Sequence, residues 1–162
     1  MSVSAGFVGT ANVNYAYTKY LSVAAFDSTS AVVCYEDDGG SDYVECAVLS
    51  TSASSTSVSV GTRREVNSHS SEHVSVSALD ATTAVVCFRR YGSGNTGHCA
   101  HLERSGTSLT ASATSSFTSS SASYVSVAAL DVQTAVVCYA SGYSYGSSRC
   151  QRLFKGLSLI HI

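Results

Sequence analysis

The sequence has 162 residues, of which 44% are apolar and 12% are charged, and its formal net charge is −2. This balance lacks the basic surface that nucleic acids and acidic membranes require, so we expect neither partner. No apolar run is long enough for a transmembrane helix, and the first residues lack the basic and apolar regions of a secretory signal.

The composition favours an all-β fold. Proline and tryptophan are absent, and helix-favouring residues such as lysine, glutamate and glutamine are few. Serine, threonine, valine, alanine and tyrosine dominate instead, which is typical of strands and turns.

One phrase occurs three times, as AAFDSTSAVVCY at residues 24–35, SALDATTAVVCF at 77–88 and AALDVQTAVVCY at 128–139. Aligning Ser22, Ser75 and Ser126 gives periods of 53 and 51 residues. Repetition at this length is typical of propellers and solenoids. We assign repeat 1 to residues 15–67, repeat 2 to residues 68–118 and repeat 3 to residues 119–156.

In chain order, residues 1–14 precede these repeats. Residues 7–14 (FVGTANVN) match residues 60–67 (VGTRREVN), which lie at the same distance before the next repeat. We therefore expect a lone strand here, either the last strand of a preceding repeat or a strand donated to a second copy.

Each repeat divides into four short apolar segments separated by polar turn residues, which predicts a four-stranded meander. In repeat 1 we predict strands a to d at residues 20–27, 31–36, 43–50 and 56–66. An aspartate ends strand a in every repeat, where its carboxylate can accept hydrogen bonds from turn amides. This indicates a turn-fixing role for Asp27, Asp80 and Asp131, with a calcium ligand as the less favoured alternative.

The six cysteines form three pairs, each 12 residues apart: Cys34 with Cys46, Cys87 with Cys99, and Cys138 with Cys150. A hairpin register that opposes each pair also opposes an alanine to a leucine in every repeat. These further pairs are Ala31 with Leu49, Ala84 with Leu102, and Ala135 with Leu153. Opposed residues of antiparallel strands lie within disulfide reach, so we expect three disulfides, each contributing ~3 kcal/mol. Reduced, buried cysteines are the alternative.

The phrase AALD…TAVVCY, a Gly-rich hairpin, a C…L pattern and the SG-TSL that follows recur along residues 12–156. In these features the chain resembles a family of tandem-repeat, propeller-like proteins of environmental microbes and algae. The resemblance implies four-stranded propeller blades that serve as lectins, adhesins or scaffolds, and it carries no catalytic motif. A ring typically needs about four to eight blades, so three repeats would form an incomplete ring.

The last strand of repeat 3 is expected near residue 157, where the sequence becomes LSLIHI. This hexapeptide can be back-translated as the transposon end sequence that is used to tag DNA libraries for sequencing. We therefore interpret residues 157–162 as adapter read-through, with a genuine variant of GTSL at residues 106–109 as the alternative. The first interpretation makes the chain a fragment of a longer repeat protein and explains the missing signal sequence.

The predicted strand order, d-abcd-abcd-abc, leaves open strands at both ends. Open strands pair readily with another copy. Copies could therefore close a ring or propagate as a filament, depending on whether the rotation between them closes.

Two motifs are better explained by the repeat than by catalysis. HSSEH at residues 69–73 matches a zinc peptidase pattern that needs a helix, but it lies in a predicted loop and occurs once. GSGNTG at residues 92–97 matches a dinucleotide pattern that needs a strand followed by a helix, but it lies at a hairpin tip. We expect no catalytic residue, cofactor or metal site; adventitious binding by these histidines with His98 or His101 is the alternative.

The hairpins between strands b and c, and the loops before strand a, vary between repeats and are rich in tyrosine. Flat apolar faces beside hydrogen-bonding groups are what sugar recognition uses, although ordinary exposed loops have a similar composition. The candidate ligand-binding residues are Tyr15, Tyr17, Tyr43, Tyr91, Tyr143, Tyr145, Asp42, Arg90 and Asn95.

The sequence thus favours a non-enzymatic, extracellular repeat protein that binds glycans or a cell surface. The expected disulfides favour the oxidising compartment. The alternative function is a structural subunit that self-assembles by strand exchange into a ring or filament.

Overall fold

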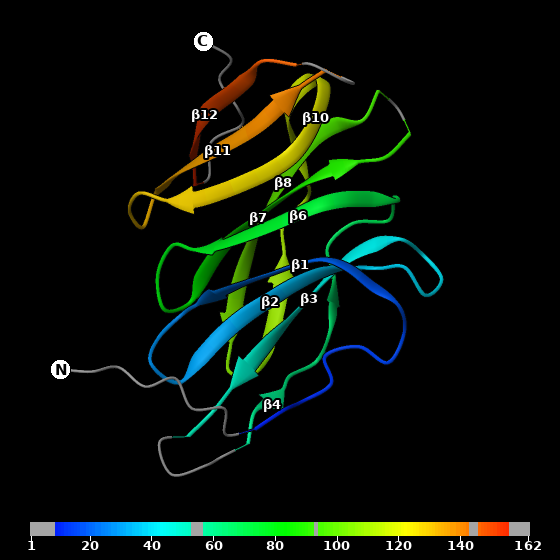
Figure 1. Cartoon of the computed structure of the whole chain (residues 1–162). Helices are drawn as coiled ribbons and strands as arrows, with labels where there is room; N and C mark the ends of the chain where they lie inside the picture. The colour runs from blue at the N-terminus through cyan, green and yellow to red at the C-terminus, as the bar shows by residue number, and fades with distance from the viewer. Residues whose placement is uncertain (1–8, 53–56, 93, 143–145, 156–162) are drawn as a thin grey trace, which may run out of the picture.

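The computed structural model describes residues 9–52, 57–92, 94–142 and 146–155 (Figure 1). These residues form antiparallel β-strands, which confirms the all-β prediction. No helix in these ranges is long and apolar enough to cross a bilayer. The strands are β1 (Thr18–Ala25), β2 (Ser30–Asp37), β3 (Tyr43–Ser50), β4 (Ser59–Val60), β5 (Arg64–Glu65), β6 (Ser71–Ala78), β7 (Thr83–Arg90), β8 (Thr96–Ser105), β9 (Ser108–Ala111), β10 (Ser115–Ala129), β11 (Thr134–Ser141) and β12 (Ser148–Phe154).

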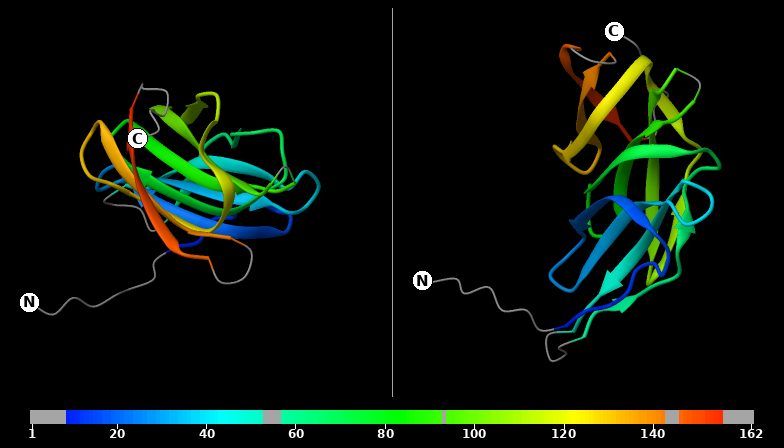
Figure 2. Two further views of the ribbon diagram at one scale, coloured as in Figure 1. Left: turned by 90° about the horizontal axis from the view of Figure 1, so that it is seen from above. Right: turned by 45° about the vertical axis from the view of Figure 1, so that its right-hand side comes forward.

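The strands form two sheets. The first, from repeat 1, has the order β1-β2-β3-β4, with β5 also paired to β3. The second has the order β12-β11-β10-β8-β7-β6, with β9 paired to β8, and its six-strand path curls into a half-barrel (Figure 2). The long β10 joins repeats 2 and 3 in this sheet, because its first part pairs with β8 and its second part with β11.

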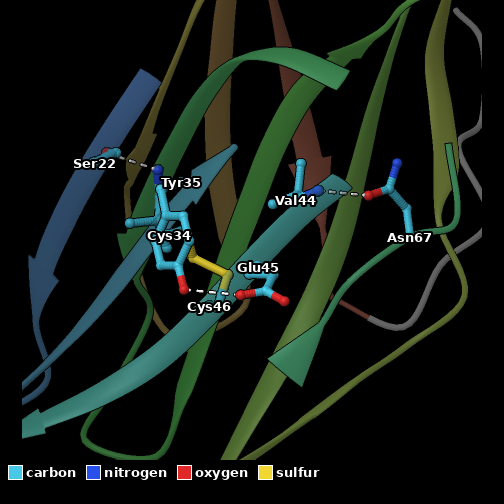
Figure 3. The surroundings of a disulfide bond; sticks show 8 residues. Ser22, Cys34, Tyr35, Val44, Glu45, Cys46 and Asn67 are labelled. Atoms are coloured by element: carbon cyan, nitrogen blue, oxygen red, sulfur yellow. Dashed lines mark hydrogen bonds between the residues drawn. A yellow bond between two sulfur atoms is a disulfide. The ribbon is translucent and has the colours of Figure 1, made fainter. Parts of the chain in front are cut away.

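The predicted hairpin register is present in all three repeats. Ala31 pairs with Leu49, Ala84 with Leu102 and Ala135 with Leu153. The same register opposes the cysteines, and the three predicted disulfides are confirmed as Cys34–Cys46, Cys87–Cys99 and Cys138–Cys150. Beside the first of them, the Tyr35 hydroxyl donates a hydrogen bond to Glu45 at 2.9 Å (Figure 3).

Strand d of repeat 1 differs from the prediction. A single strand over residues 56–66 was expected, but within the described residues the structure has the two short strands β4 and β5. Between them, Gly61 packs against repeat 2 so closely that a Cβ atom there would lie 2.1 Å from the carbonyl oxygen of Thr107. This contact between repeats favours glycine, and Gly61 lies where the two short strands separate.

Apolar side chains of successive repeats pack against one another. One core cluster joins Val32, Cys34 and Val48 of repeat 1 to Val86 and Leu102 of repeat 2. A second cluster joins repeats 2 and 3 around Phe117 and Tyr139. Each junction therefore buries apolar side chains from two repeats, which is the main source of stability between them.

Serine side chains connect neighbouring a strands. The backbone amide of Val76 donates to Ser22 Oγ at 3.1 Å, and the amide of Val127 donates to Ser75 Oγ at 3.1 Å. These contacts satisfy amides of a strand that faces the preceding repeat, as buried amides require.

Candidate ligand-binding face

Strand a of every repeat contains an irregularity at the same place. The pairing register shifts between Lys19 and Ser22 in β1, and equivalent shifts occur in β6 and β10. At each shift a residue other than glycine has a left-handed backbone: Tyr20 (φ 49°), His73 (φ 55°) and Tyr124 (φ 52°). Such conformations cost about 1–3 kcal/mol each and cluster at functional sites, and bulges redirect side chains.

The three rings at these positions form a continuous row, which we call the aromatic row. The ring centroids of Tyr20 and His73 lie 4.9 Å apart, and those of His73 and Tyr124 lie 5.2 Å apart. Tyr20 is 39% exposed and Tyr124 is 78% exposed, whereas His73 is half-buried. Burial lowers the pKa of His73, which favours the neutral ring at pH 7.

Charged and polar side chains accompany the aromatic row. Lys19, which precedes Tyr20, forms an ion pair with Asp38 at 2.8 Å. Glu72, which precedes His73, forms an ion pair with Arg89. Arg89 also donates to Ser123 Oγ at 3.0 Å, and Ser123 precedes Tyr124. We call these five residues the polar line; they supply donors and acceptors along all three repeats.

Backbone hydrogen bonds join the b-to-c hairpin of each repeat to the residues at the start of strand a, a few positions before the ring of the aromatic row. The amide of Asp38 donates to the Tyr17 carbonyl at 2.9 Å, and the amide of Tyr91 donates to the Ser70 carbonyl at 2.8 Å. An equivalent bond joins Gly142 to Ser121 in repeat 3. The b-to-c hairpin therefore lies beside the start of strand a in every repeat.

The candidate residues from the sequence have different surroundings in the structure. Tyr15, Tyr17 and Tyr91 are 89%, 79% and 57% exposed. Tyr43, Asp42 and Arg90 are partly buried. Asn95 is buried, and its side-chain oxygen accepts a hydrogen bond from the Gly92 amide at 3.3 Å. Tyr143 and Tyr145 lie outside the described residues, as does the suspected adapter segment 157–162.

Sequence reasoning missed the aromatic row. The repeat alignment contains its signal, because the residue two positions before the aligned serine is Tyr20, His73 and Tyr124 in turn. The bulge at these positions interrupts the alternation of side chains between the two faces of the strand. The apolar pattern of the sequence alone therefore did not reveal the aromatic row.

Three carboxylates of repeat 1, including that of Asp38 from the polar line, lie close together. One oxygen from each of Glu36, Asp38 and Asp42 lies within 4.8 Å of the others. Glu36 is only 4% exposed. Desolvation raises its pKa to about 7, although Lys19 partly opposes this shift. We call this group the acidic corner; within the described residues it is the set that could hold a metal ion.

A cavity of about 460 Å³ lies between repeats 2 and 3. It is lined by apolar residues, including Leu79, Val85 and Leu153, and by His101 and Lys155. In the corresponding junction between repeats 1 and 2, Leu109 of β9 packs in the core. Because the cavity lies beside β12, where a fourth strand would pair by analogy with β9, we do not assign it to ligand binding.

The described residues of the two catalytic-looking motifs lie in a strand and a hairpin turn, not in the helical settings that their chemistry requires. Glu72 and His73 lie on β6, a strand, where Glu72 forms an ion pair with Arg89 and the His73 ring makes tilted contacts in the aromatic row. In GSGNTG, Gly92 and Gly94 have φ values of 106° and 80°, as expected of a hairpin turn.

Comparison with known proteins identifies the fold alone. No protein-family model matches the chain, and no curated protein is significantly similar. A solved structure of a protein of unknown function from Dyadobacter fermentans DSM 18053 matches with a TM-score of 0.58 and 10% sequence identity. The match covers 88% of this chain and 39% of that chain, so this chain spans about two fifths of the other's length.

Proposed function

We propose that the chain is a non-enzymatic, extracellular repeat module that binds glycans through the aromatic row. One observation carries this proposal: three successive repeats each hold a ring at a left-handed bulge, and the rings form one row whose two tyrosines are exposed. The repetition of a costly backbone conformation in all three repeats favours a role for the rings in binding.

The chemistry of the row suits sugars. Aromatic faces stack against the apolar faces of sugar rings, and nearby polar groups bond the hydroxyls. The polar line provides both donors and acceptors, in Lys19, Arg89, Asp38 and Glu72. Because the row continues across three repeats, we expect an extended oligosaccharide chain as the ligand.

The wider architecture supports an adhesive or lectin-like role. Core clusters shared between successive disulfide-linked β units support propeller-type blades, as in the resembled family. The three disulfides indicate an oxidising, extracellular compartment. We therefore propose that these repeats form part of a propeller, completed by further repeats or by other copies.

The test is binding of the folded, disulfide-intact and multimerised protein to a glycan array, followed by affinity measurement on the best ligand. Tyr20→Ala and Tyr124→Ala should each weaken binding about 2- to 10-fold, corresponding to about 0.5–1.5 kcal/mol for one aromatic contact. Phe154→Ala is the matched control, because Phe154 is 47% exposed and lies outside the row. Failure of the wild-type protein to bind any glycan, or an equal loss in the control, would contradict the proposal.

A second candidate function is self-assembly, favoured by the exposed end of repeat 3. Leu130 is 60% exposed, whereas the equivalent Phe26 is 8% exposed and packs in the core between repeats 1 and 2. Ser126 is also exposed, whereas the equivalent Ser22 accepts a hydrogen bond from a backbone amide of the next repeat. This end therefore has the chemistry of a junction between repeats.

Light scattering tests this second candidate. The full chain should form rings or filaments, and deletion of residues 1–14, which removes the proposed donor strand, should abolish them. Unchanged assembly after the deletion would refute strand exchange.

A further inference from the structure

The acidic corner lies where β2 leads into its hairpin with β3. Glu36 is near the end of β2, and Asp38 and Asp42 belong to the hairpin. Calcium binds oxygen ligands at about 2.3–2.6 Å, so two oxygens on one ion can be separated by at most about 5 Å. The 4.8 Å limit that contains the three carboxylate oxygens of this corner meets that condition.

The side chain of Glu36 favours a cation at this corner. Its side chain is 4% exposed, and among the described residues its Oε2 atom has no hydrogen-bond partner. A buried carboxylate without a partner is costly. A cation bound at this corner would remove that cost directly.

The charged cross-strand pair of repeat 1 differs from that of repeat 2. Lys19 pairs across the strands with Glu36, and in repeat 2 the equivalent pair is Glu72 with Arg89, with the charges reversed. In repeat 2 the two side chains form an ion pair. In repeat 1 Lys19 instead contacts Asp38, and its side chain is 54% exposed.

The excess negative charge also belongs to repeat 1 alone. Repeat 2 has Tyr91 and Asn95 at the positions of Asp38 and Asp42. Repeat 3 has Ala140, Gly142 and Gly146 at the positions of the three carboxylates. One ammonium therefore faces three carboxylates at this corner, and a divalent cation would balance the remainder.

We propose that Glu36, Asp38 and Asp42 bind one divalent cation, and that this cation is Ca²⁺. All three side chains offer oxygen, the ligand that Ca²⁺ and Mg²⁺ prefer, and Ca²⁺ accepts the less regular geometry. The hairpin places Asp42 by two backbone bonds: its amide donates to Asp37 at 2.9 Å and its carbonyl accepts from Ser71 at 2.8 Å. Because Lys19 competes for the three carboxylates, we expect a Kd for Ca²⁺ in the weak range of extracellular modules, about 10⁻⁴–10⁻³ M.

The test is calorimetric titration of the EDTA-stripped, disulfide-intact protein with CaCl₂ and separately with MgCl₂, together with thermal unfolding in each salt. We expect one Ca²⁺ per chain with a Kd of about 10⁻⁴–10⁻³ M, weaker Mg²⁺ binding, and a melting temperature that rises with Ca²⁺. Absence of both a binding heat and a thermal shift at about 10 mM Ca²⁺, well above that range, would overturn the proposal. Equal or tighter Mg²⁺ binding would overturn the choice of Ca²⁺.

Three variants locate the site. Glu36→Gln should weaken Ca²⁺ binding at least 10-fold, yet should fold at least as stably as wild type in EDTA because it removes a buried, unpaired charge. Lys19→Gln should tighten binding, because it removes the competing ammonium from Asp38. Glu103→Gln is the matched control, because Glu103 is 68% exposed and lies in repeat 2. Wild-type affinity in Glu36→Gln, or equal loss in Glu103→Gln, would contradict the assignment.

Discussion

At the scale of single residues, the turn after strand a is organised by one aspartate in each repeat. Asp80 accepts hydrogen bonds from the amides of Thr82 and Thr83 at 2.7 and 2.8 Å. Asp27 and Asp131 accept equivalent bonds from the amides two residues on. The turn is thus fixed by side-chain acceptors within three residues, which is why it was predictable from local sequence.

Because of these hydrogen bonds, the stability of the folded protein should change with pH in the acidic range. Burial alone would raise the pKa of Asp80, but the hydrogen bonds from Thr82 and Thr83 outweigh it and lower the pKa to about 2. Because the folded pKa lies below the unfolded value of about 3.9, the stabilisation is complete above about pH 4 and is lost as pH falls towards 2.

Substituting Asp80→Asn should therefore destabilise the protein at pH 7 by about 1–3 kcal/mol, since bonds to a charged acceptor are lost. The difference from wild type should shrink between about pH 4 and pH 2, as the wild-type carboxylate protonates. Urea unfolding across this range measures it. A difference independent of pH would show that the charge of Asp80 contributes nothing.

At the scale of the strands, the disulfides differ in access to solvent. Cys34, Cys46 and Cys87 have no exposed surface. Cys99 and Cys138 are partly exposed, and Cys150 alone among the six is exposed. The first two disulfides lie at or near junctions between repeats, and the third lies in the last described hairpin.

Limited reduction should therefore open Cys138–Cys150 first, because a reducing thiolate must reach the sulfur it attacks. Brief treatment with dithiothreitol under native conditions, alkylation and peptide mass spectrometry would identify the labelled cysteines. Initial labelling of Cys87 and Cys99 would contradict the packing of repeats 2 and 3.

The strands differ in how far the sequence predicts them. The hairpin of strands b and c was predictable in register, because cysteine pairs and alanine–leucine pairs constrain it twice. The interruption at Gly61 was not, because it coincides with a contact with Thr107, far away in sequence. The aromatic row was also not predicted from the sequence, because the bulges at Tyr20, His73 and Tyr124 depend on how the strands pair.

At the scale of the whole molecule, stacking depends on contacts between equivalent residues of neighbouring repeats. The continuous β10 merges repeats 2 and 3 into one curled sheet, whereas repeat 1 has its own. Repeat periodicity predicted similar units but not this merging, because the alignment does not determine whether strand d continues directly into the next strand a. A core cluster of apolar side chains from two repeats nevertheless occurs at both junctions.

Substitutions of two equivalent serines would measure how much the hydrogen bond between neighbouring a strands contributes to stability. Ser75 Oγ accepts the Val127 amide at 3.1 Å, whereas Ser126 is exposed. Ser75→Ala should cost about 1–3 kcal/mol, because an amide at the junction loses its acceptor. Ser126→Ala, the matched control, should change stability by less than about 0.5 kcal/mol. Equal effects in urea unfolding would show that the serine contact does not hold the repeats together.

The most direct measurement of the central claim is an NMR titration that follows the aromatic ring resonances of the protein as its best-binding oligosaccharide is added. Resonances of Tyr20, His73 and Tyr124 should shift together and saturate at one ligand concentration, because one glycan chain covers the row. Shifts confined to the loop tyrosines Tyr15, Tyr17 and Tyr91, with the row unchanged, would contradict the account.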